Sequence, residues 1–302
     1  MYRGKSITGK PDHPAVKLED VLMKELSIGF SPCPNDTYIF CALVNGHIKV
    51  DDLMLAPAKL EDVETLNLWA MEGLLDITKL SFHAFGHVRE KYALLHAGAA
   101  LGRGCGPLLV SNRLLRPDAF ADMTVAVPGR YTTGAMLLKL YAPAWRNVEV
   151  MRFDQIMAAV ETGKVDCGVI IHEGRFTYQS RGLVLLADLG SWWEEISGHP
   201  IPLGGIAVKR SLGNELIQKV DRSIRASISW TRKNPQVCRP YIKEHAQELA
   251  DNVINEHIDL YVNSFSEDLG TTGITAIDFF LNKGHEAGLF PKQGDNSLPI
   301  SY

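Results

Sequence analysis

Apolar positions along this chain follow two alternating patterns. Short apolar runs typical of buried strands alternate with longer segments in which apolar residues recur every three to four positions, as on one face of a helix. Strands are predicted near residues 25–30, 53–56, 76–81, 92–95, 107–110, 123–127, 148–153, 165–171, 183–189 and 206–208, and helices near 36–45, 61–72, 133–141, 155–162 and from about 209 to 289. The alternation predicts an α/β protein with a largely parallel sheet.

The same local pattern occurs twice. A helix ends at a glycine suited to a left-handed C′ position, and an aspartate three residues later opens an apolar strand: Gly73 precedes Asp76, and Gly163 precedes Asp166. This weak repetition predicts two similar lobes. We expect lobe one to comprise residues 24–109 and 205–302, lobe two residues 110–204, and residues 1–23 to form a flexible tail.

Because the chain would then cross twice between its lobes, the pattern predicts a hinged clamshell with discontinuous lobes. A ligand would lie in the crevice, at the carboxyl ends of the strands. This is the architecture of the type II periplasmic-binding-protein fold. Two glycine-containing segments connect the lobes: residues 102–106, interpreted as a crossover hinge, and residues 191–205, interpreted as a loop.

Composition excludes several classes of function. A net charge of -4, with 46% hydrophobic and 22% charged residues, is typical of a folded globular protein and provides no basic footprint for nucleic acid or an anionic membrane. Neither an export signal in the first 22 residues nor an apolar run of membrane-spanning length is present. We therefore expect a cytoplasmic protein. Nothing in the sequence indicates the oligomeric state.

The five cysteines are widely spaced and include no C-x-x-C pair. This pattern indicates neither a disulfide framework nor a zinc site, and it favours a reducing compartment. Cys33 is interpreted as a small buried thiol rather than a nucleophile, because no histidine is near it in sequence. His83 and His87 are four residues apart but lack the glutamate of an H-E-x-x-H motif, so no metal site is expected there.

Polar residues at strand ends are the candidates for a binding site. Asn35 and Asp36 follow the first strand in a loop stiffened by two prolines; Asp36 is expected to cap the next helix, which leaves Asn35 for the pocket. Lys79 and Ser81 alternate with Leu80, so both can face the crevice. From these residues alone we favour the alternative, in which Lys79 reaches solvent and Ser81 caps a helix.

The start of the helix at 133–141 is a candidate anion site. Its free backbone N–H groups lie beside the hydroxyls of Thr132 and Thr133 and beside Gly134, an arrangement that suits a carboxylate or phosphate. Thr133 can equally be a plain N-cap. His172 ends the strand at 165–171 and can act as a general base that titrates near neutrality, although a single histidine at a strand end is more often a hydrogen-bonded surface residue.

Four motifs carry a resemblance that covers about residues 24–289. The strings SPCPNDTYIF at 31–40, DITKLS at 76–81, GPL at 106–108 and IHEG at 171–174 occur in this order. Together they resemble the 1,4-dihydroxy-6-naphthoate synthase family, which belongs to the futalosine route to menaquinone.

The resemblance implies a cytosolic carbon–carbon lyase that works without metal or organic cofactor and converts cyclic dehypoxanthine futalosine to 1,4-dihydroxy-6-naphthoate. It implies that His172 is the base and that Lys79, Ser81, Thr133 and Gly134 hold a carboxylate substrate, with Thr132 as the alternative threonine. Two other functions remain open: the chorismate dehydratase of the same pathway, and a non-enzymatic cytosolic solute-binding protein of the same fold. The IHEG string favours the synthase over the dehydratase.

Overall fold

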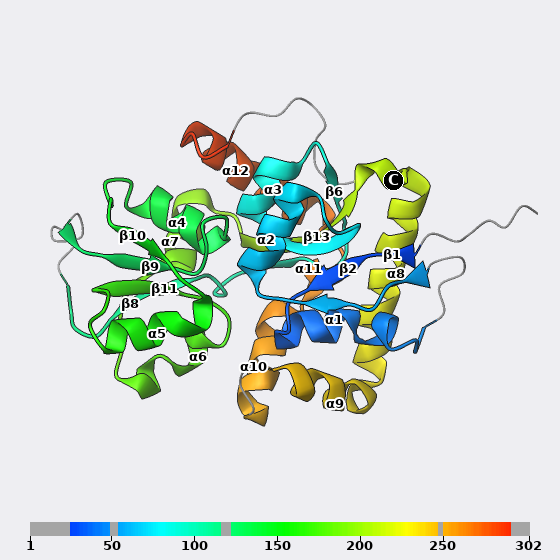
Figure 1. Ribbon diagram of the computed structural model, residues 1–302, viewed down its shortest axis with the longest axis horizontal. Coiled ribbons are helices and arrows are strands. Elements are labelled where there is room, and N and C mark those ends of the chain that lie inside the picture. Colours follow the sequence, from blue (N-terminus) through cyan, green and yellow to red (C-terminus); the bar gives the residue numbers. More distant parts are fainter. Residues whose placement is uncertain (1–24, 49–53, 116–121, 247–249, 291–302) are drawn as a thin grey trace, which may run out of the picture.

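The computed structural model describes residues 25–48, 54–115, 122–246 and 250–290. Figure 1 shows two halves side by side, with the elements from the middle of the chain, drawn in green, forming the half at the left. Each half contains its own sheet. The predicted tail, residues 1–23, lies outside the described residues.

The larger sheet has the strand order β4-β2-β5-β13-β6, and β7 also pairs with β13. Its strands are β2 (Ile28–Phe30), β4 (Lys59–Leu60), β5 (Ile77–Ser81), β6 (Tyr92–Leu94), β7 (Ala100–Gly102) and β13 (Ile201–Lys209). A separate pair consists of β1 (Glu25–Leu26) and β3 (Met54–Leu55). Strand β2 is parallel to β4 and β5, whereas β13 is antiparallel to all three of its partners.

The smaller sheet has the order β10-β9-β11-β8-β12. Its strands are β8 (Leu108–Ser111), β9 (Val125–Val127), β10 (Val148–Val150), β11 (Cys167–Ile170) and β12 (Val184–Asp188). Strand β8 runs antiparallel to both of its neighbours. The prediction of largely parallel sheets is therefore wrong for β8 and β13, because an apolar run predicts a buried strand but carries no information about its direction.

The chain passes between the two sheets twice. It leaves the larger sheet after β7, enters the smaller one at β8, and returns with β13. The glycine-rich run 102–106 forms the first connection. This double crossing agrees with the expected discontinuous lobes. The lobe boundaries at 109/110 and 204/205 fall inside β8 and β13 and stay a prediction.

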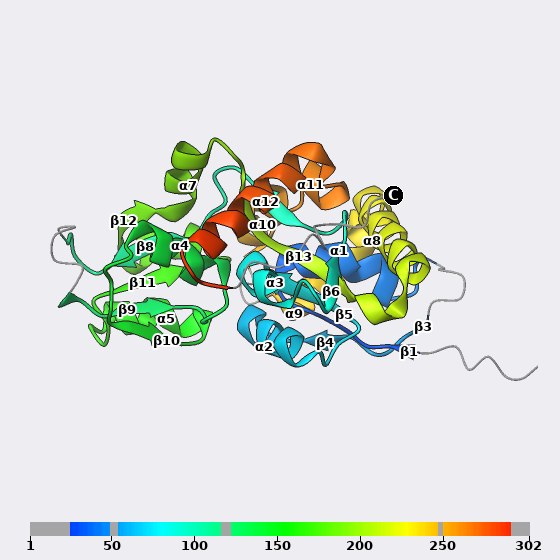
Figure 2. The same ribbon diagram turned by 90° about the horizontal axis from the view of Figure 1, so that it is seen from above.

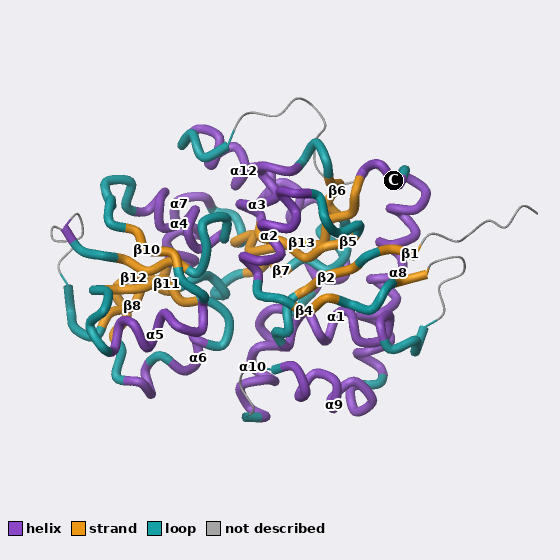
Figure 3. Tube along the Cα trace, in the orientation of Figure 1, coloured by secondary structure: helices purple, strands orange, loops and turns teal. Residues whose placement is uncertain are grey.

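Helices cover both sheets, as the purple segments of Figure 3 show. They are α1 (Pro34–Val44), α2 (Val63–Glu72), α3 (Phe82–Val88), α4 (Thr133–Tyr141), α5 (Phe153–Glu161), α6 (Gly174–Thr177), α7 (Leu189–Ser197), α8 (Asn214–Lys233), α9 (Pro235–His245), α10 (Asp251–Tyr261), α11 (Ser264–Glu267) and α12 (Gly270–Glu286). The helical C-terminal region is confirmed. No described helix combines the length and hydropathy needed to cross a membrane.

The loop predicted at 191–205 is wrong, because this segment contains most of α7 and the first part of β13. The side chain of Asp188 caps α7 by accepting hydrogen bonds from the amides of Gly190 and Ser191. Trp193 is fully buried, and its ring meets the edge of Phe280 in α12 at a centroid distance of 5.1 Å. Figure 2 shows α12 above the junction of the two halves. Burial of Trp193 outweighs the local Gly, Pro and Trp content from which the loop was predicted.

The predicted internal repeat is visible in the hydrogen bonds. Gly73 and Gly163 both adopt left-handed conformations, with φ of 72° each, at the ends of α2 and α5. The carboxylate of Asp76 accepts from the amide of Ser27, just before β2, and that of Asp166 accepts from the amide of Thr124, just before β9. Each aspartate thus ties the start of its own strand to that of the neighbouring strand.

The expectation that the cysteines form no disulfide is wrong for one pair. Cys41 in α1 and Cys238 in α9 are disulfide-bonded across a sequence separation of 197, while Cys33, Cys105 and Cys167 are free and buried. Helices α1 and α9 bring the two thiols together, and no spacing rule in the sequence reveals so distant a contact.

Three titratable thiols are therefore expected in the denatured, unreduced protein, and all five after reduction. Thiol titration in denaturant, before and after reduction, measures both numbers. Five thiols without reductant would show that Cys41 and Cys238 stay reduced.

Candidate active site

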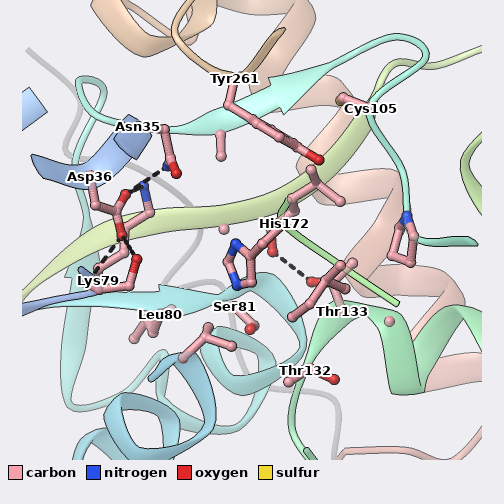
Figure 4. A pocket seen from close by; sticks show the side chains of 18 of the residues that line it. Asn35, Asp36, Lys79, Leu80, Ser81, Cys105, Thr132, Thr133, His172 and Tyr261 are labelled. Carbon is pink, nitrogen blue, oxygen red and sulfur yellow. Dashed lines mark hydrogen bonds and ion pairs between the residues drawn. The ribbon is translucent and has the colours of Figure 1, made fainter. Parts of the chain in front are cut away.

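A cavity lies between residues of the two halves, and Figure 4 shows it from close by. Its lining includes every residue predicted from the sequence as catalytic or substrate-binding: Asn35, Lys79, Ser81, Thr132, Thr133, Gly134 and His172. The first three come from the larger half and the other four from the smaller half. The sequence therefore predicted their common location, while their roles stay predictions.

A buried ion pair forms one side of the cavity. Lys79 Nζ is 2.7 Å from Asp36 Oδ1 and 3.0 Å from the carbonyl oxygen of Gly98. Lys79 is 5% exposed and Asp36 is 2% exposed. Asp36 Oδ2 also accepts from the amide and hydroxyl of Ser31. The solvent-facing alternative for Lys79 is therefore wrong, since its ammonium group is neutralised inside the protein.

Asp36 is not the helix cap that the sequence predicted. Helix α1 begins at Pro34 with Cys33 in the N-cap position, so Asp36 lies in the first turn and its side chain turns back to Ser31 and Lys79. Pro34 starts the helix earlier than expected, because proline is well suited to the first helical position. An ammonium group has three donors, and the contacts described here use two of those on Lys79, which leaves one for a ligand.

Asn35 connects this ion pair to a histidine that sequence analysis missed. Its Nδ2 donates to Asp36 Oδ1 at 2.9 Å, so its Oδ1 is the acceptor that faces His257 Nε2, also at 2.9 Å. His257 is fully buried in α10, which lowers its pKa well below the ordinary value, and its Nδ1 lies 3.7 Å from Glu173 Oε1. Together with Tyr261, one helical turn later, it lines the cavity.

His257 and Tyr261 carried a weak signal in the sequence. They lie four residues apart on the same face of α10 as the buried Val253 and Ile254. This spacing looks like an ordinary apolar helix face, and only the fold places that face against the cavity.

Ser81 lies at the end of β5, in the N-cap position of α3, yet its side chain makes no capping bond. Instead its Oγ accepts a hydrogen bond from Asn67 Nδ2 at 3.2 Å, and its amide donates to Asn67 Oδ1 at 2.9 Å. The predicted capping role is therefore wrong. With Asn67 as donor, the Ser81 hydroxyl keeps its own hydrogen for a ligand in the cavity.

The two threonines of α4 have different structural roles. Thr132, not Thr133, is the N-cap: its Oγ1 accepts from the amide of Ala135 and donates to the carbonyl oxygen of Gly129. Thr133 Oγ1 donates to the carbonyl oxygen of Leu203 at 2.6 Å, which links the smaller half to β13 of the larger half. Both hydroxyl hydrogens are used within the protein, so neither threonine can donate one to a carboxylate.

The backbone amides of Thr133 and Gly134 are the first two of α4 and have no acceptor within the helix. Both residues line the cavity, at the positive end of the helix dipole. The candidate anion site therefore consists of backbone amides, with the Ser81 hydroxyl and one N–H of Lys79 on the opposite wall.

His172 follows β11 and extends from the smaller half towards the larger one (Figure 4). Its backbone has a φ of 55°, the left-handed conformation that non-glycine residues adopt rarely and mostly at functional sites. Its Nε2 is buried and has no hydrogen-bond partner within the described residues, while its Nδ1 lies 3.4 Å from Cys33 Sγ. No sequence pattern indicates this contact, because 139 positions separate the two residues.

Burial also lowers the pKa of His172 to about 4. The nearby Asp36 opposes this effect only in part. The expectation that this histidine titrates near neutrality is therefore wrong, and at neutral pH His172 is an uncharged imidazole that can accept a proton.

Thr132 and Thr133 can be separated by experiment. Thr132→Val removes the N-cap and should cost about 0.5–2 kcal/mol of stability, with little change in KM. Thr133→Val removes the bond between the halves, worth about 0.5–1.5 kcal/mol, and should raise KM by a few-fold up to about tenfold. Thermal melting and steady-state kinetics of both variants measure these effects. A Thr133→Val enzyme with unchanged KM would contradict the importance of this contact for binding.

Comparison with known proteins identifies the family. Residues 26–286 match the sequence model of a family described as "Menaquinone biosynthesis". The chain belongs to the menaquinone-biosynthesis family. It is 49% identical to the 1,4-dihydroxy-6-naphthoate synthase of Thermus thermophilus over 267 residues, which cover 88% of this chain and 96% of the relative. It is 42% identical to the synthase of Streptomyces coelicolor over 281 residues, which cover 90% and 97%. The resemblance stated from four motifs is thus confirmed.

Solved structures confirm the fold. A crystal structure of a protein from Archaeoglobus fulgidus matches with a TM-score of 0.83 and 32% identity, covering 88% of this chain and 98% of that one. The periplasmic aliphatic sulphonate binding protein of Escherichia coli matches with a TM-score of 0.60 at 12% identity, covering 92% and 94%. A Candida albicans protein described as having the generic periplasmic-binding-protein fold matches with a TM-score of 0.63 at 14% identity, covering 92% and 98%.

Proposed function

We propose that this protein is a cytosolic carbon–carbon lyase that converts cyclic dehypoxanthine futalosine to 1,4-dihydroxy-6-naphthoate and releases a small sugar-derived fragment. The names of two relatives at 49% and 42% identity support the product. The observation that carries the mechanism is that Nε2 of His172 has no hydrogen-bond partner within the described residues, at a cavity that is also lined by the first two residues of α4.

The substrate carboxylate would bind to the amides of Thr133 and Gly134. The Ser81 hydroxyl and the third N–H of Lys79 would complete its hydrogen bonds from the opposite wall. Because the Lys79–Asp36 pair is neutral as a unit, the amides and the helix dipole supply most of the attraction for the anion. A ligand held by groups from both halves would stabilise a closed cavity and exclude water from His172.

His172 would then act as the general base. Its Nε2 takes a proton from a carbon next to a carbonyl, and the electron pair of the broken C–H bond forms a new double bond as the adjoining carbon–carbon bond breaks. The leaving fragment takes the electrons of that bond together with the proton now on His172, which restores the base, and the remaining ring system becomes aromatic. A positioned general base contributes about 10²–10⁴-fold to the rate, and aromatisation supplies further driving force.

Turnover of the substrate tests the proposal. Purified protein incubated with cyclic dehypoxanthine futalosine should produce the absorbance of 1,4-dihydroxy-6-naphthoate, with the product identified by mass. A parallel incubation with chorismate should leave that compound unchanged. Dehydration of chorismate would instead assign the chorismate dehydratase activity. Binding of the futalosine derivative without conversion would assign a solute-binding protein.

A further inference from the structure

The contact between Cys33 and His172 joins the two halves at the cavity. Cys33 occupies the N-cap position of α1 in the larger half, and its Sγ lies 3.4 Å from Nδ1 of His172 in the smaller half. Two other side chains confine the His172 ring: Phe153 meets it edge-on at a centroid distance of 5.0 Å, and His257 is parallel to it at 6.2 Å. The ring therefore has a fixed orientation, with Nδ1 towards sulfur and a buried Nε2 that has no hydrogen-bond partner within the described residues.

A neutral imidazole carries one hydrogen, which is on either Nδ1 or Nε2. Only the tautomer with hydrogen on Nδ1 leaves Nε2 free to accept a proton from a substrate. In that tautomer Cys33 Sγ must act as the acceptor. The direction of the hydrogen bond between these two residues therefore decides whether His172 can work as a base through Nε2.

The residues behind Cys33 hold it in place. Asp36 is an acceptor only, and its Oδ2 receives the hydroxyl hydrogen of Ser31 at 2.7 Å. Ser31 Oγ in turn accepts a hydrogen bond from the backbone amide of Cys33 at 3.4 Å. The S–H bond of Cys33 can rotate, so its sulfur can present lone pairs to the Nδ1–H of His172.

We propose that Cys33 is a positioning residue that holds His172 in the Nδ1–H tautomer, with its sulfur as the acceptor. The inference rests on the proposed function, in which Nε2 of His172 is the base. The backbone of Cys33 is held through Ser31 by the Asp36 carboxylate, which Lys79 and the first turn of α1 hold in place. The arrangement resembles the orientation of a catalytic histidine by a carboxylate, with a thiol in the place of the carboxylate.

Burial supports a Cys33 sulfur that stays protonated and acts as an acceptor. Cys33 is 1% exposed, and burial and the nearby Glu173 raise the pKa of its thiol well above the ordinary value. The sulfur therefore keeps its hydrogen and takes no part as a thiolate nucleophile. His172 makes this contact from a left-handed backbone conformation, with a φ of 55°.

Three variants test the proposal. Cys33→Ala removes the acceptor, Cys33→Ser restores a donor and acceptor at the same position, and Cys167→Ala is the matched control. Cys167 is fully buried at the opposite end of β11, and its sulfur contacts the carbonyl oxygen of Thr124, 3.8 Å away, rather than the cavity. We expect kcat to fall about tenfold or more in Cys33→Ala with KM within about twofold, substantial recovery in Cys33→Ser, and unchanged kcat in Cys167→Ala.

A second measurement does not depend on turnover. Long-range proton–nitrogen NMR correlations of His172 report which ring nitrogen carries hydrogen. The wild type should show hydrogen on Nδ1, and Cys33→Ala should lose this preference. Hydrogen on Nε2 in the wild type would overturn the proposal, as would Cys33→Ala with wild-type kcat or with Cys33→Ser no better than Cys33→Ala. If the wild type shows the Nδ1–H tautomer but does not convert the substrate, the proposed function fails while the assigned hydrogen bond between His172 and Cys33 stands.

Discussion

Replacement of His172 by Asn should lower kcat by about 10²-fold or more, with KM within a few-fold of the wild type. Asparagine fills much of the same space and remains polar, but it cannot accept a proton near neutral pH. The groups assigned to the substrate carboxylate, the amides of Thr133 and Gly134 and the hydroxyl of Ser81, are unaffected by the change. Steady-state kinetics on the futalosine substrate measure both constants. Near wild-type turnover in His172→Asn would remove this residue from the mechanism.

The pH profile of the wild type supplies a second readout of the same residue. Because burial lowers the pKa of His172 to about 4, the imidazole is already deprotonated at pH 7. We expect kcat/KM to stay level from pH 7 to about pH 5 and to fall as the pH approaches 4. A decline centred near 6.5, the ordinary histidine value, would show that the site is more hydrated than its geometry indicates.

Low pH also lowers the stability of the folded protein, so the pH profile of kcat/KM must be corrected for unfolding. The folded protein takes up a proton on His172 only near pH 4, whereas the unfolded chain does so near 6.5. Stability contributed by the neutral imidazole is therefore lost progressively as the pH falls from about 6.5 to 4. His83, whose pKa burial also lowers to about 4, adds to the loss in the same window. Circular dichroism at each pH separates unfolding from protonation of the base.

Asp36→Asn should destabilise the protein by about 3–5 kcal/mol, because it leaves the Lys79 ammonium buried without its counter-charge. Lys79 would retain the carbonyl oxygen of Gly98 as a partner, at 3.0 Å. Equilibrium unfolding in denaturant measures the loss. Glu286→Gln is a suitable control, since it removes an exposed ion pair with Lys283 and should change stability by less than about 1 kcal/mol.

A double variant distinguishes the buried charge from lost packing. Combining Asp36→Asn with Lys79→Met removes both charges, and an apolar replacement of a buried pair is often close to neutral. The double variant should therefore be more stable than Asp36→Asn alone. A double variant that is less stable would show that the pair itself contributes net stability. Asp36→Asn at wild-type stability would contradict the buried, ionised state of the pair.

Much of the fold could be predicted because its signals are local. Apolar periodicity located most strands and helices. The glycines after α2 and α5 marked the ends of these helices, because glycine readily adopts the left-handed conformation found there. Strand direction and the helix α7 could not be predicted in this way. Direction depends on which strands become neighbours, and α7 is stabilised by burial of Trp193 against α12.

The candidate site was predictable to the extent that its residues stand at the carboxyl ends of strands or at a helix start. Lys79, Thr133 and His172 all satisfy that rule, and all line the cavity. What the rule could not supply is the set of partners, since Asp36 for Lys79 and Cys33 for His172 are distant in sequence. For the same reason the low pKa of His172 was missed: it results from burial created by both halves together.

A crystal structure of the His172→Asn variant with cyclic dehypoxanthine futalosine tests the central claim most directly. The variant should bind the substrate but not consume it. We predict that the carboxylate lies within hydrogen-bond distance of the Thr133 and Gly134 amides, and that the carbon that loses its proton lies about 3–3.5 Å from the side chain at position 172. Substrate bound outside this cavity, or with its reacting carbon remote from position 172, would contradict the account.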